Sequence, residues 1–171
     1  MTHPGEKFPQ INLNLVEGDE RQLPADCRQS FTLFLVYRGL HCSVCAAYLK
    51  EFSECLGELK TLGVEVIAAS SDTQEKAIQA RHLWTGEKIQ FAYDLTKEQG
   101  KELGLYRSVA RKSVEPNEFF EPGMYIILKS GVLLYLSLQN MPFGRMSVQE
   151  LLTWIPKIEK NQIPPRGTLH Y

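Results

Sequence analysis

This sequence has few of the features that assign a protein directly to a class, such as many cysteines, an excess of one charge or a long apolar run. Its 171 residues contain four cysteines, which are too few for the disulfide scaffold of a small secreted domain. The 19 basic and 20 acidic residues leave a formal net charge of −1, so no broad basic surface is expected for nucleic acid or anionic lipid. No apolar run approaches the length of a membrane span. We therefore expect neither nucleic acid nor a membrane among its partners.

The chain also starts without the apolar segment of a signal peptide, because residues 1–7 are mostly polar. A cytoplasmic location is therefore expected. In that compartment reductants keep most thiols reduced, so closely spaced cysteines are more often catalytic than structural. With 43 % hydrophobic and 23 % charged residues, the composition is typical of a globular protein. The length suits a single domain over residues 1–171.

The most informative feature that is present is Cys-Ser-Val-Cys at 42–45, between an apolar segment and a helical pattern. The first N–H groups of a helix are unpaired and carry partial positive charge, which favours a thiolate over a thiol. Cys42 is expected in the exposed first turn, and Cys45 on the face that points to the core. This arrangement indicates that Cys42 attacks and Cys45 resolves the mixed disulfide.

The cysteine pair is also compatible with metal binding or with no role at all. Paired cysteines at this spacing bind structural zinc in many proteins, but the chain has no second pair of that kind. The remaining candidates, Cys27, Cys55 and four scattered histidines, lack the spacing of a zinc module. Two buried cysteines without a role are common as lone residues, but less so at this spacing and position. The motif and its place before a helix therefore favour redox chemistry.

The apolar pattern predicts an alternation of strands and helices along most of the chain. Gly63 and Gly104 are expected to end two of the helices. Pro156 is expected to kink or split the last helix, because proline removes a backbone donor. The predicted strands cover residues 31–37, 64–69, 89–93, 124–128 and 132–138, and the predicted helices cover 46–62, 74–83, 97–103 and 147–160.

The order of these elements predicts an α/β fold with a mixed central sheet and helices on both faces. Residues 1–30 are a polar lead-in, in which alternation over 11–15 indicates a short edge strand in a hairpin. Residues 107–118 are expected to form a polar loop, and residues 161–171 an extended tail. The cysteine pair would lie at the carboxyl end of a central strand, where open α/β sheets bind ligands.

The motif, a proline directly before the hairpin and the order of the helices resemble the thioredoxin fold. The closer resemblance is to peroxiredoxin-like proteins of the alkyl hydroperoxide reductase/thiol-specific antioxidant family. Each segment by itself matches the family only weakly, but the order of the segments along the chain is specific to it. The resemblance covers residues 5–15 as the lead-in, 31–56 as the active-site unit, and then 66–72, 91–106 and 123–134.

The chain departs from the peroxiredoxin pattern at three positions. That pattern is similar to Pro-x-x-x-Thr-x-x-Cys, and the resemblance places Cys45 at the peroxide-reactive position, Cys42 at the threonine and Arg38 at the proline. Pro122 stands where peroxiredoxins have an arginine that helps to bind peroxide. A proline at that place resembles the cis-proline of thioredoxin, which lies against the disulfide. The resemblance thus implies a peroxiredoxin frame with thioredoxin-type chemistry.

Three neighbours of the cysteines have more than one interpretation. Arg38 either stabilises a thiolate or ends the strand in solvent. His41 lowers the pKa of Cys42 if it is protonated, or is a turn histidine in solvent. Glu121, beside Pro122, is either a proton acceptor near the sulfurs or a solvated loop acid, and the second description is favoured.

The predicted function is that of a thiol-dependent redox enzyme in which Cys42 and Cys45 cycle between dithiol and disulfide, with Arg38, His41 and Pro122 in support. No organic cofactor or metal is expected, because the attack runs through a thiolate. The expected partners are a thiol reductant, such as a thioredoxin or glutathione system, and a disulfide or peroxide substrate, with a homodimer left open. The alternatives are an efficient thiol peroxidase, in which Cys45 or Cys42 reacts with peroxide, and a non-catalytic binding or metal-binding module.

Overall fold

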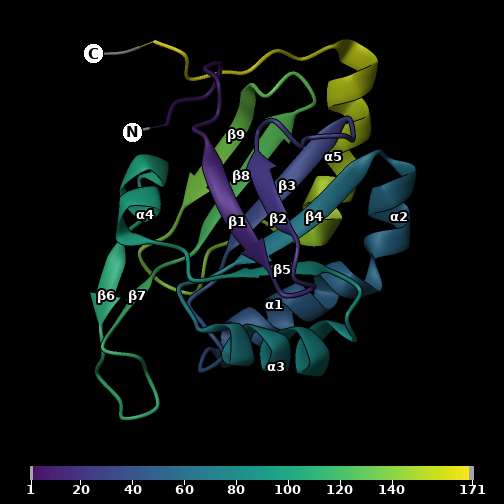
Figure 1. Cartoon of the computed structure of the whole chain (residues 1–171). Coiled ribbons are helices and arrows are strands. Elements are labelled where there is room, and N and C mark those ends of the chain that lie inside the picture. Colours follow the sequence, from purple (N-terminus) through teal and green to yellow (C-terminus); the bar gives the residue numbers. More distant parts are fainter. Residues whose placement is uncertain (1, 170–171) are drawn as a thin grey trace.

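A computed structural model describes residues 2–169 and shows a seven-stranded mixed sheet with helices on both faces (Figure 1). The strand order is β2-β1-β5-β4-β3-β8-β9, and a separate two-stranded sheet pairs β6 with β7. In chain order the elements are β1 (Ile11–Leu15), β2 (Glu20–Leu23), β3 (Phe31–Val36), α1 (Ser43–Glu54), α2 (Leu56–Thr61), β4 (Val64–Ala69), α3 (Gln74–Thr85), β5 (Gln90–Tyr93), α4 (Lys97–Leu103), β6 (Arg107–Val109), β7 (Glu118–Phe120), β8 (Gly123–Leu128), β9 (Leu133–Leu138) and α5 (Val148–Asn161). This architecture confirms the predicted α/β thioredoxin-like fold.

The central strand is β3, and all six of its residues are buried. It pairs in parallel with β4, from Phe31 opposite Val64, and antiparallel with β8 on its other side. Leu33 and Leu35 pack with α1, α2, α3 and α5, whereas the alternate residues of β3 pack with α4 and β7. A strand that is apolar at almost every position is therefore covered on both faces, as the sequence predicts.

The N-terminal hairpin is present, but its first strand is not at the edge of the sheet. β1 pairs with β2 on one side and with β5 on the other, so β2 is the edge strand. The alternation over β1 reflects burial of every second side chain against the sheet. Residues 163–169, at the C-terminus, form no helix or strand, and the last two residues of the predicted tail lie outside the described part of the chain.

Two helix predictions need correction. The helix expected over 46–62 is two helices, because the backbone at Cys55, with φ −94° and ψ 8°, leaves the helical region. The last helix is not split at Pro156, because α5 is continuous over Val148–Asn161, with Leu151 and Ile155 buried in the turns before the proline. In the described part of the chain, no helix is both long and apolar enough to span a bilayer.

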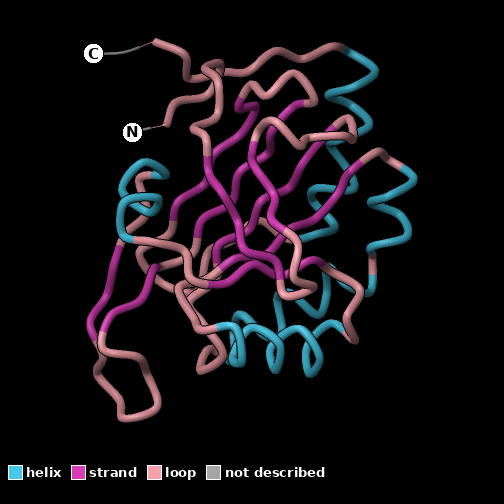
Figure 2. Tube along the Cα trace, viewed as in Figure 1, coloured by secondary structure: helices cyan, strands magenta, loops and turns pink. Residues whose placement is uncertain are grey.

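The segment expected as a polar loop contains β6 and, just beyond it, β7, which form a hairpin that projects from the body of the molecule (Figure 2). The strands are short, and most of β6 is exposed, so they carry no apolar alternation that would identify them. Only Phe119 and Phe120 of this hairpin are buried. The hairpin lies beside the end of the sheet that carries the cysteines.

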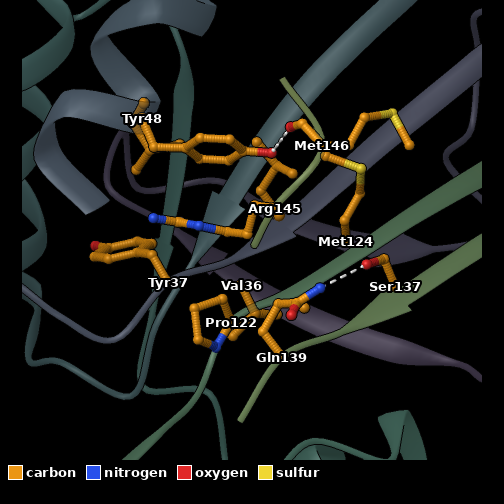
Figure 3. Close-up of a pocket in the computed structure, with 12 residues that line it drawn as sticks. Val36, Tyr37, Tyr48, Pro122, Met124, Ser137, Gln139, Arg145 and Met146 are labelled. Atoms are coloured by element: carbon orange, nitrogen blue, oxygen red, sulfur yellow. Dashed lines mark hydrogen bonds between the residues drawn. The ribbon is translucent and has the colours of Figure 1, made fainter. Parts of the chain in front are cut away.

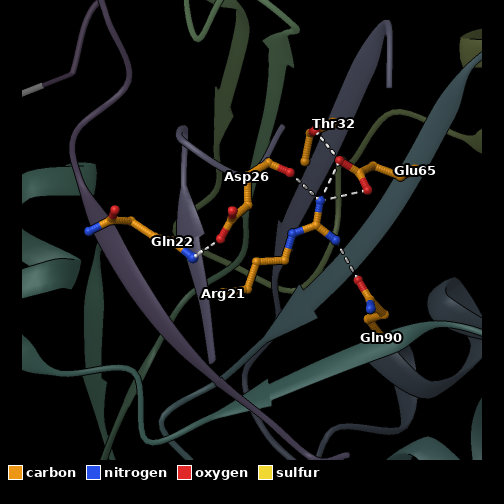
Figure 4. A network of polar contacts seen from close by, with 6 residues as sticks. All are labelled: Arg21, Gln22, Asp26, Thr32, Glu65 and Gln90. Atoms are coloured by element: carbon orange, nitrogen blue, oxygen red, sulfur yellow. Dashed lines mark hydrogen bonds and ion pairs between the residues drawn. The ribbon is translucent and has the colours of Figure 1, made fainter. Parts of the chain in front are cut away.

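At the opposite end of β3, an ionic network ties the N-terminal hairpin to the central strands (Figure 4). Arg21 Nη2 lies 2.7 Å from both carboxylate oxygens of Glu65 in β4. The same guanidinium donates to the backbone of Asp26 and to the side chain of Gln90, each at 2.8 Å. Thr32 donates a 2.6 Å hydrogen bond to Glu65. The network therefore joins four strands around one guanidinium.

Candidate active site

The cysteine pair lies where the sequence predicts it, at the carboxyl end of β3 and the start of α1. Cys42 is the N-cap of α1, and its Sγ accepts a 3.2 Å hydrogen bond from the backbone N–H of Cys45. The cap thus uses a sulfur where most helices use the oxygen of Ser, Thr, Asp or Asn. Partial positive charge at the helix start is directed at this sulfur.

The expected exposure of Cys42 is wrong. Cys42 is 4 % exposed and Cys45 is fully buried. The cause is the cap itself, because the Cys42 side chain turns back toward the backbone of Cys45 instead of out to solvent. The expectation that Cys45 faces the core is confirmed, since it packs with Leu49 and Phe52 of the same helix.

The two sulfurs differ strongly in acidity. The pKa of Cys42 is lowered to about 6, chiefly because the Cys45 side chain donates a hydrogen bond to its sulfur, and burial opposes this effect. The Cys45 backbone N–H and the charges of Arg38 and Arg145 lower it further. The pKa of Cys45 is raised by the same hydrogen bond, which retains its proton, and by burial. Near neutral pH the pair is therefore a Cys42 thiolate and a Cys45 thiol.

The structure adds a residue that the sequence did not indicate, Arg145, in the segment between β9 and α5. Its Nη1 lies 3.9 Å from Cys45 Sγ, and its Nη2 donates to the backbone oxygen of Val44 at 3.3 Å. The guanidinium carbon lies 4.0 Å from the ring centre of Tyr48, whose hydroxyl donates to the backbone of Met146 at 2.6 Å (Figure 3). No local pattern could have revealed this contact, which joins residues 100 positions apart.

A small cavity lies beside Arg145 (Figure 3). Pro122 lines it together with Tyr37, Met124 and Gln139, whose backbone N–H donates to the Pro122 oxygen at 2.9 Å. The resemblance of Pro122 to a cis-proline fails, because the only cis peptide bond among residues 2–169 precedes Pro24. Pro122 is therefore a wall of the cavity beside Arg145, with a trans peptide bond.

Arg38 and Glu121 form an ion pair, so neither is a solvated loop residue. Arg38 Nε lies 3.4 Å from Glu121 Oε2, and Glu121 is 3 % exposed. Arg38 also faces Glu115 at 3.6 Å and the ring of Phe119 at 4.5 Å. The description of Glu121 as a solvated acid is therefore wrong, and Arg38 is held beside the active-site loop by the segment around β7.

His41 does not supply a positive charge to Cys42. Both ring nitrogens are buried without a hydrogen-bond partner, and the ring packs on Phe119 at 4.9 Å between centres. Burial, followed by the charge of Arg38, lowers the pKa of His41, so the ring is neutral near pH 7. Both interpretations of His41 from the sequence, a protonated ring beside Cys42 and a turn histidine in solvent, are therefore wrong.

The loop before Cys42 has a shape that only glycine allows. Gly39 has φ +135°, and a Cβ there would lie 2.9 Å from both carboxylate oxygens of Asp72. Asp72 is buried after β4 and accepts a 2.6 Å hydrogen bond from the backbone N–H of Leu40. The carboxylate thus fixes the loop that presents Cys42.

The arrangement suits thiol chemistry. A nucleophilic thiolate, a protonated second thiol within hydrogen-bond reach and two nearby cations are the groups needed for thiol–disulfide exchange. Among residues 2–169, no three His, Cys, Asp or Glu side chains are grouped so that they could hold a metal ion.

Comparison with known proteins agrees with this geometry. The family model of the AhpC/TSA family matches residues 4–136. Human peroxiredoxin-4 is 28 % identical over 145 residues, which are 81 % of this chain and 51 % of that protein. The bovine peroxiredoxin-4 is 26 % identical over the same length, covering 81 % of this chain and 50 % of that protein. The chain therefore spans about half the length of the curated relatives it matches.

Solved peroxiredoxins share the fold at low sequence identity. A mutant of peroxiredoxin 6 of Arenicola marina superposes with a TM-score of 0.79 at 20 % identity, over 95 % of this chain and 76 % of that one. The reduced 2-Cys peroxiredoxin of Plasmodium vivax gives 0.75 at 19 % identity, over 95 % and 84 %. Because the family model covers most of the chain and the fold agrees, the chain belongs to the AhpC/TSA family, whose members are thiol-dependent oxidoreductases.

Proposed function

We propose that the protein reduces disulfides through Cys42 and Cys45, which cycle between dithiol and disulfide. The observation that carries the proposal is the N-cap position of Cys42, whose Sγ accepts the backbone N–H of Cys45 at 3.2 Å. The pKa of Cys42 is lowered to about 6, whereas the pKa of Cys45 is raised and its thiol keeps the proton. A thiolate paired with a thiol is the state from which exchange starts.

The proposed reaction has two steps. The Cys42 thiolate attacks one sulfur of a substrate disulfide, so that a mixed disulfide forms and the other substrate sulfur leaves as a thiolate and takes up a proton. Cys45 then loses its proton and attacks Cys42 Sγ, which releases the second substrate sulfur as a thiol. The substrate gains two electrons and two protons, and the chain is left with a disulfide. A thiol reductant of the thioredoxin or glutathione class returns it to the dithiol.

A second candidate, reduction of peroxide by Cys45, is favoured by one observation. Arg145 lies 3.9 Å from Cys45 Sγ, so a cation stands at the sulfur that the family resemblance places at the peroxide-reactive position. In that reaction the Cys45 thiolate attacks the O–O bond, a sulfenic acid and water or an alcohol form, and Cys42 then displaces water to close the disulfide. It requires the proton to move from Cys45 to Cys42, against the direction in which the two pKa values are shifted.

The peroxide reaction also lacks two donors of the peroxiredoxin pattern, since Cys42 replaces the threonine and Pro122 replaces the arginine. Donors that polarise a breaking bond are each worth several kcal/mol of barrier, roughly 3 kcal/mol in measured cases. A disulfide needs no such donors, only an accessible thiolate. Both sulfurs are buried, so either substrate requires a local opening of the structure around Cys42.

The two candidates are separated by measuring both rates with one common thiol donor. We expect a small-molecule or protein disulfide to be reduced faster than hydrogen peroxide. Cys42→Ser should abolish disulfide reduction, and Cys45→Ser should trap the mixed disulfide. Peroxide reduction that far outpaces disulfide reduction, and that falls about tenfold or more in Arg145→Gln, would instead identify a peroxidase.

We also propose a setting and partners for this reaction. A reducing compartment such as the cytoplasm keeps the dithiol form available. The substrate is a disulfide, the electron donor is a thiol reductant, and no organic cofactor takes part in either step. A homodimer is compatible with this reaction, because both sulfurs come from one chain.

A further inference from the structure

One buried carboxylate, paired with Arg38, has no part in the proposed reaction. Glu121 is 3 % exposed, and its Oε1 accepts a 2.6 Å hydrogen bond from the Ser108 hydroxyl in β6. Its Oε2 has no hydrogen-bond partner and lies 3.4 Å from Arg38 Nε. A buried carboxylate is costly unless a cation stays near it. The pairing therefore requires that Arg38 remain in place.

The side chain of Arg38 contacts three residues of one continuous segment, 115–121. Its side chain is 17 % exposed, and its Nη2 faces Glu115 Oε1 at 3.6 Å. Its guanidinium carbon lies 4.5 Å from the centre of the Phe119 ring. Arg38 Nε and Glu121 Oε2 are both buried without a hydrogen-bond partner, so this contact depends on attraction between charges. An arginine held by the charges of two carboxylates is held less firmly when one of those charges is removed.

We propose that Glu121 is a positioning residue for the dithiol, which holds the Arg38 guanidinium beside the active-site loop so that its charge favours the Cys42 thiolate. The inference rests on the proposed function, because it concerns the reactivity of the same sulfur. Ser108 fixes the carboxylate, and Glu115 assists from the loop of the β6–β7 hairpin. The segment around β7 would thus influence the acidity of Cys42 through Arg38.

The charged and titratable groups that act on Cys42 come from three elements. They are the Cys45 thiol in α1, Arg38 at the end of β3, and Arg145 before α5. The pKa of Cys42 is lowered first by the hydrogen bonds from Cys45 and then by the two arginines. Glu121 affects the Cys42 sulfur only indirectly, by holding Arg38. Its removal should therefore matter only while Arg38 is present.

The test is the apparent pKa of Cys42 in the reduced full-length protein, from alkylation rates against pH resolved by peptide. Glu121→Gln keeps the side-chain length and an oxygen for Ser108 but removes the charge. We expect the pKa of Cys42 to rise by about one unit, because the freed guanidinium turns to solvent. Arg38→Ala should give a similar rise, and the double variant should rise no further than Arg38→Ala.

Glu118→Gln is the matched control, because Glu118 lies on the same hairpin but pairs with Lys97 and Arg107. It should leave the pKa of Cys42 unchanged. If Glu121→Gln fails to fold, Ser108→Ala loosens the same carboxylate and should give a smaller rise. A fall in the pKa would mean that Glu121 neutralises Arg38, and no change would mean that Arg38 is held otherwise; either result overturns the proposal. No substrate is needed, so this test can fail while disulfide reduction stands.

Discussion

At the scale of single residues, the reactivity of the pair depends on which sulfur keeps the proton. Cys42 combines the N-cap position with a hydrogen bond from the Cys45 thiol, and these effects outweigh the burial that opposes a thiolate. Cys45 is buried more deeply; it donates a hydrogen bond to Cys42, and its Sγ lies 3.9 Å from Arg145 Nη1. Arg145, beside Cys45, limits the cost of forming the second thiolate when the mixed disulfide is resolved.

This asymmetry predicts the pH dependence of labelling. The thiolate of Cys42 forms as pH rises through its lowered pKa, so its alkylation rate should be half-maximal near pH 6 and level off by about pH 8. Cys45 should stay unlabelled over that range because its pKa is raised. Peptide-resolved mass spectrometry after timed alkylation measures both. Faster labelling of Cys45 would transfer the attacking role to it.

At the scale of elements, the β6–β7 hairpin is fitted to the rest of the fold through α4. Gly100 lies in this helix, and a Cβ there would lie 2.1 Å from the Phe120 ring of β7. The helix therefore has glycine at this position, although alanine has the higher helix propensity, because only glycine lets Phe120 pack this closely. This contact fixes the base of the hairpin that carries the partners of Arg38.

Gly100→Ala should therefore destabilise the protein, although alanine gains about 1 kcal/mol of helix propensity over glycine. Overpacking against Phe120 should cost about 2 kcal/mol net, within the range for well-packed cores. Urea unfolding monitored by circular dichroism measures the change. Gly57→Ala in α2 is the control, since a Cβ there meets nothing within 4 Å, and it should be neutral or stabilising. Equal effects at both positions would contradict the packing argument.

Much of the fold could be predicted because local patterns reflect burial. The strand at 64–69 has the predicted bounds, and the apolar segment of β3 lies in the centre of the sheet. The β6–β7 hairpin could not be predicted, because its strands are short and mostly exposed. The motif located the sulfurs, but the burial of Cys42 follows from a cap hydrogen bond that spacing does not specify.

The contacts that tune the site were not predictable for a different reason. Arg145 reaches Cys45 across 100 positions, and Glu121 meets Arg38 only because β8 lies beside β3. Such pairs are determined by the topology of the sheet, and a single sequence carries no local signal for them. The same topology explains why Glu121 is buried although it lies in a connection between two strands.

At the scale of the whole molecule, the sheet separates two kinds of polar structure. The Arg21–Glu65 network holds the N-terminal hairpin at one end of β3, and the thiols with their arginines lie at the other. The first is a set of direct hydrogen bonds of 2.6 to 2.8 Å. The contacts of Arg38 with Glu121 and Glu115 are longer, at 3.4 and 3.6 Å, and depend on attraction between charges.

The most direct test of the central claim is the mass of the protein before and after one equivalent of a mild oxidant, followed by peptide mapping. We expect a loss of two hydrogen atoms and a single new link between Cys42 and Cys45, reversed by a thiol reductant. Cys27 and Cys55 should remain free. A disulfide that includes Cys27 or Cys55, or a gain of oxygen with no disulfide, would contradict a Cys42–Cys45 redox cycle.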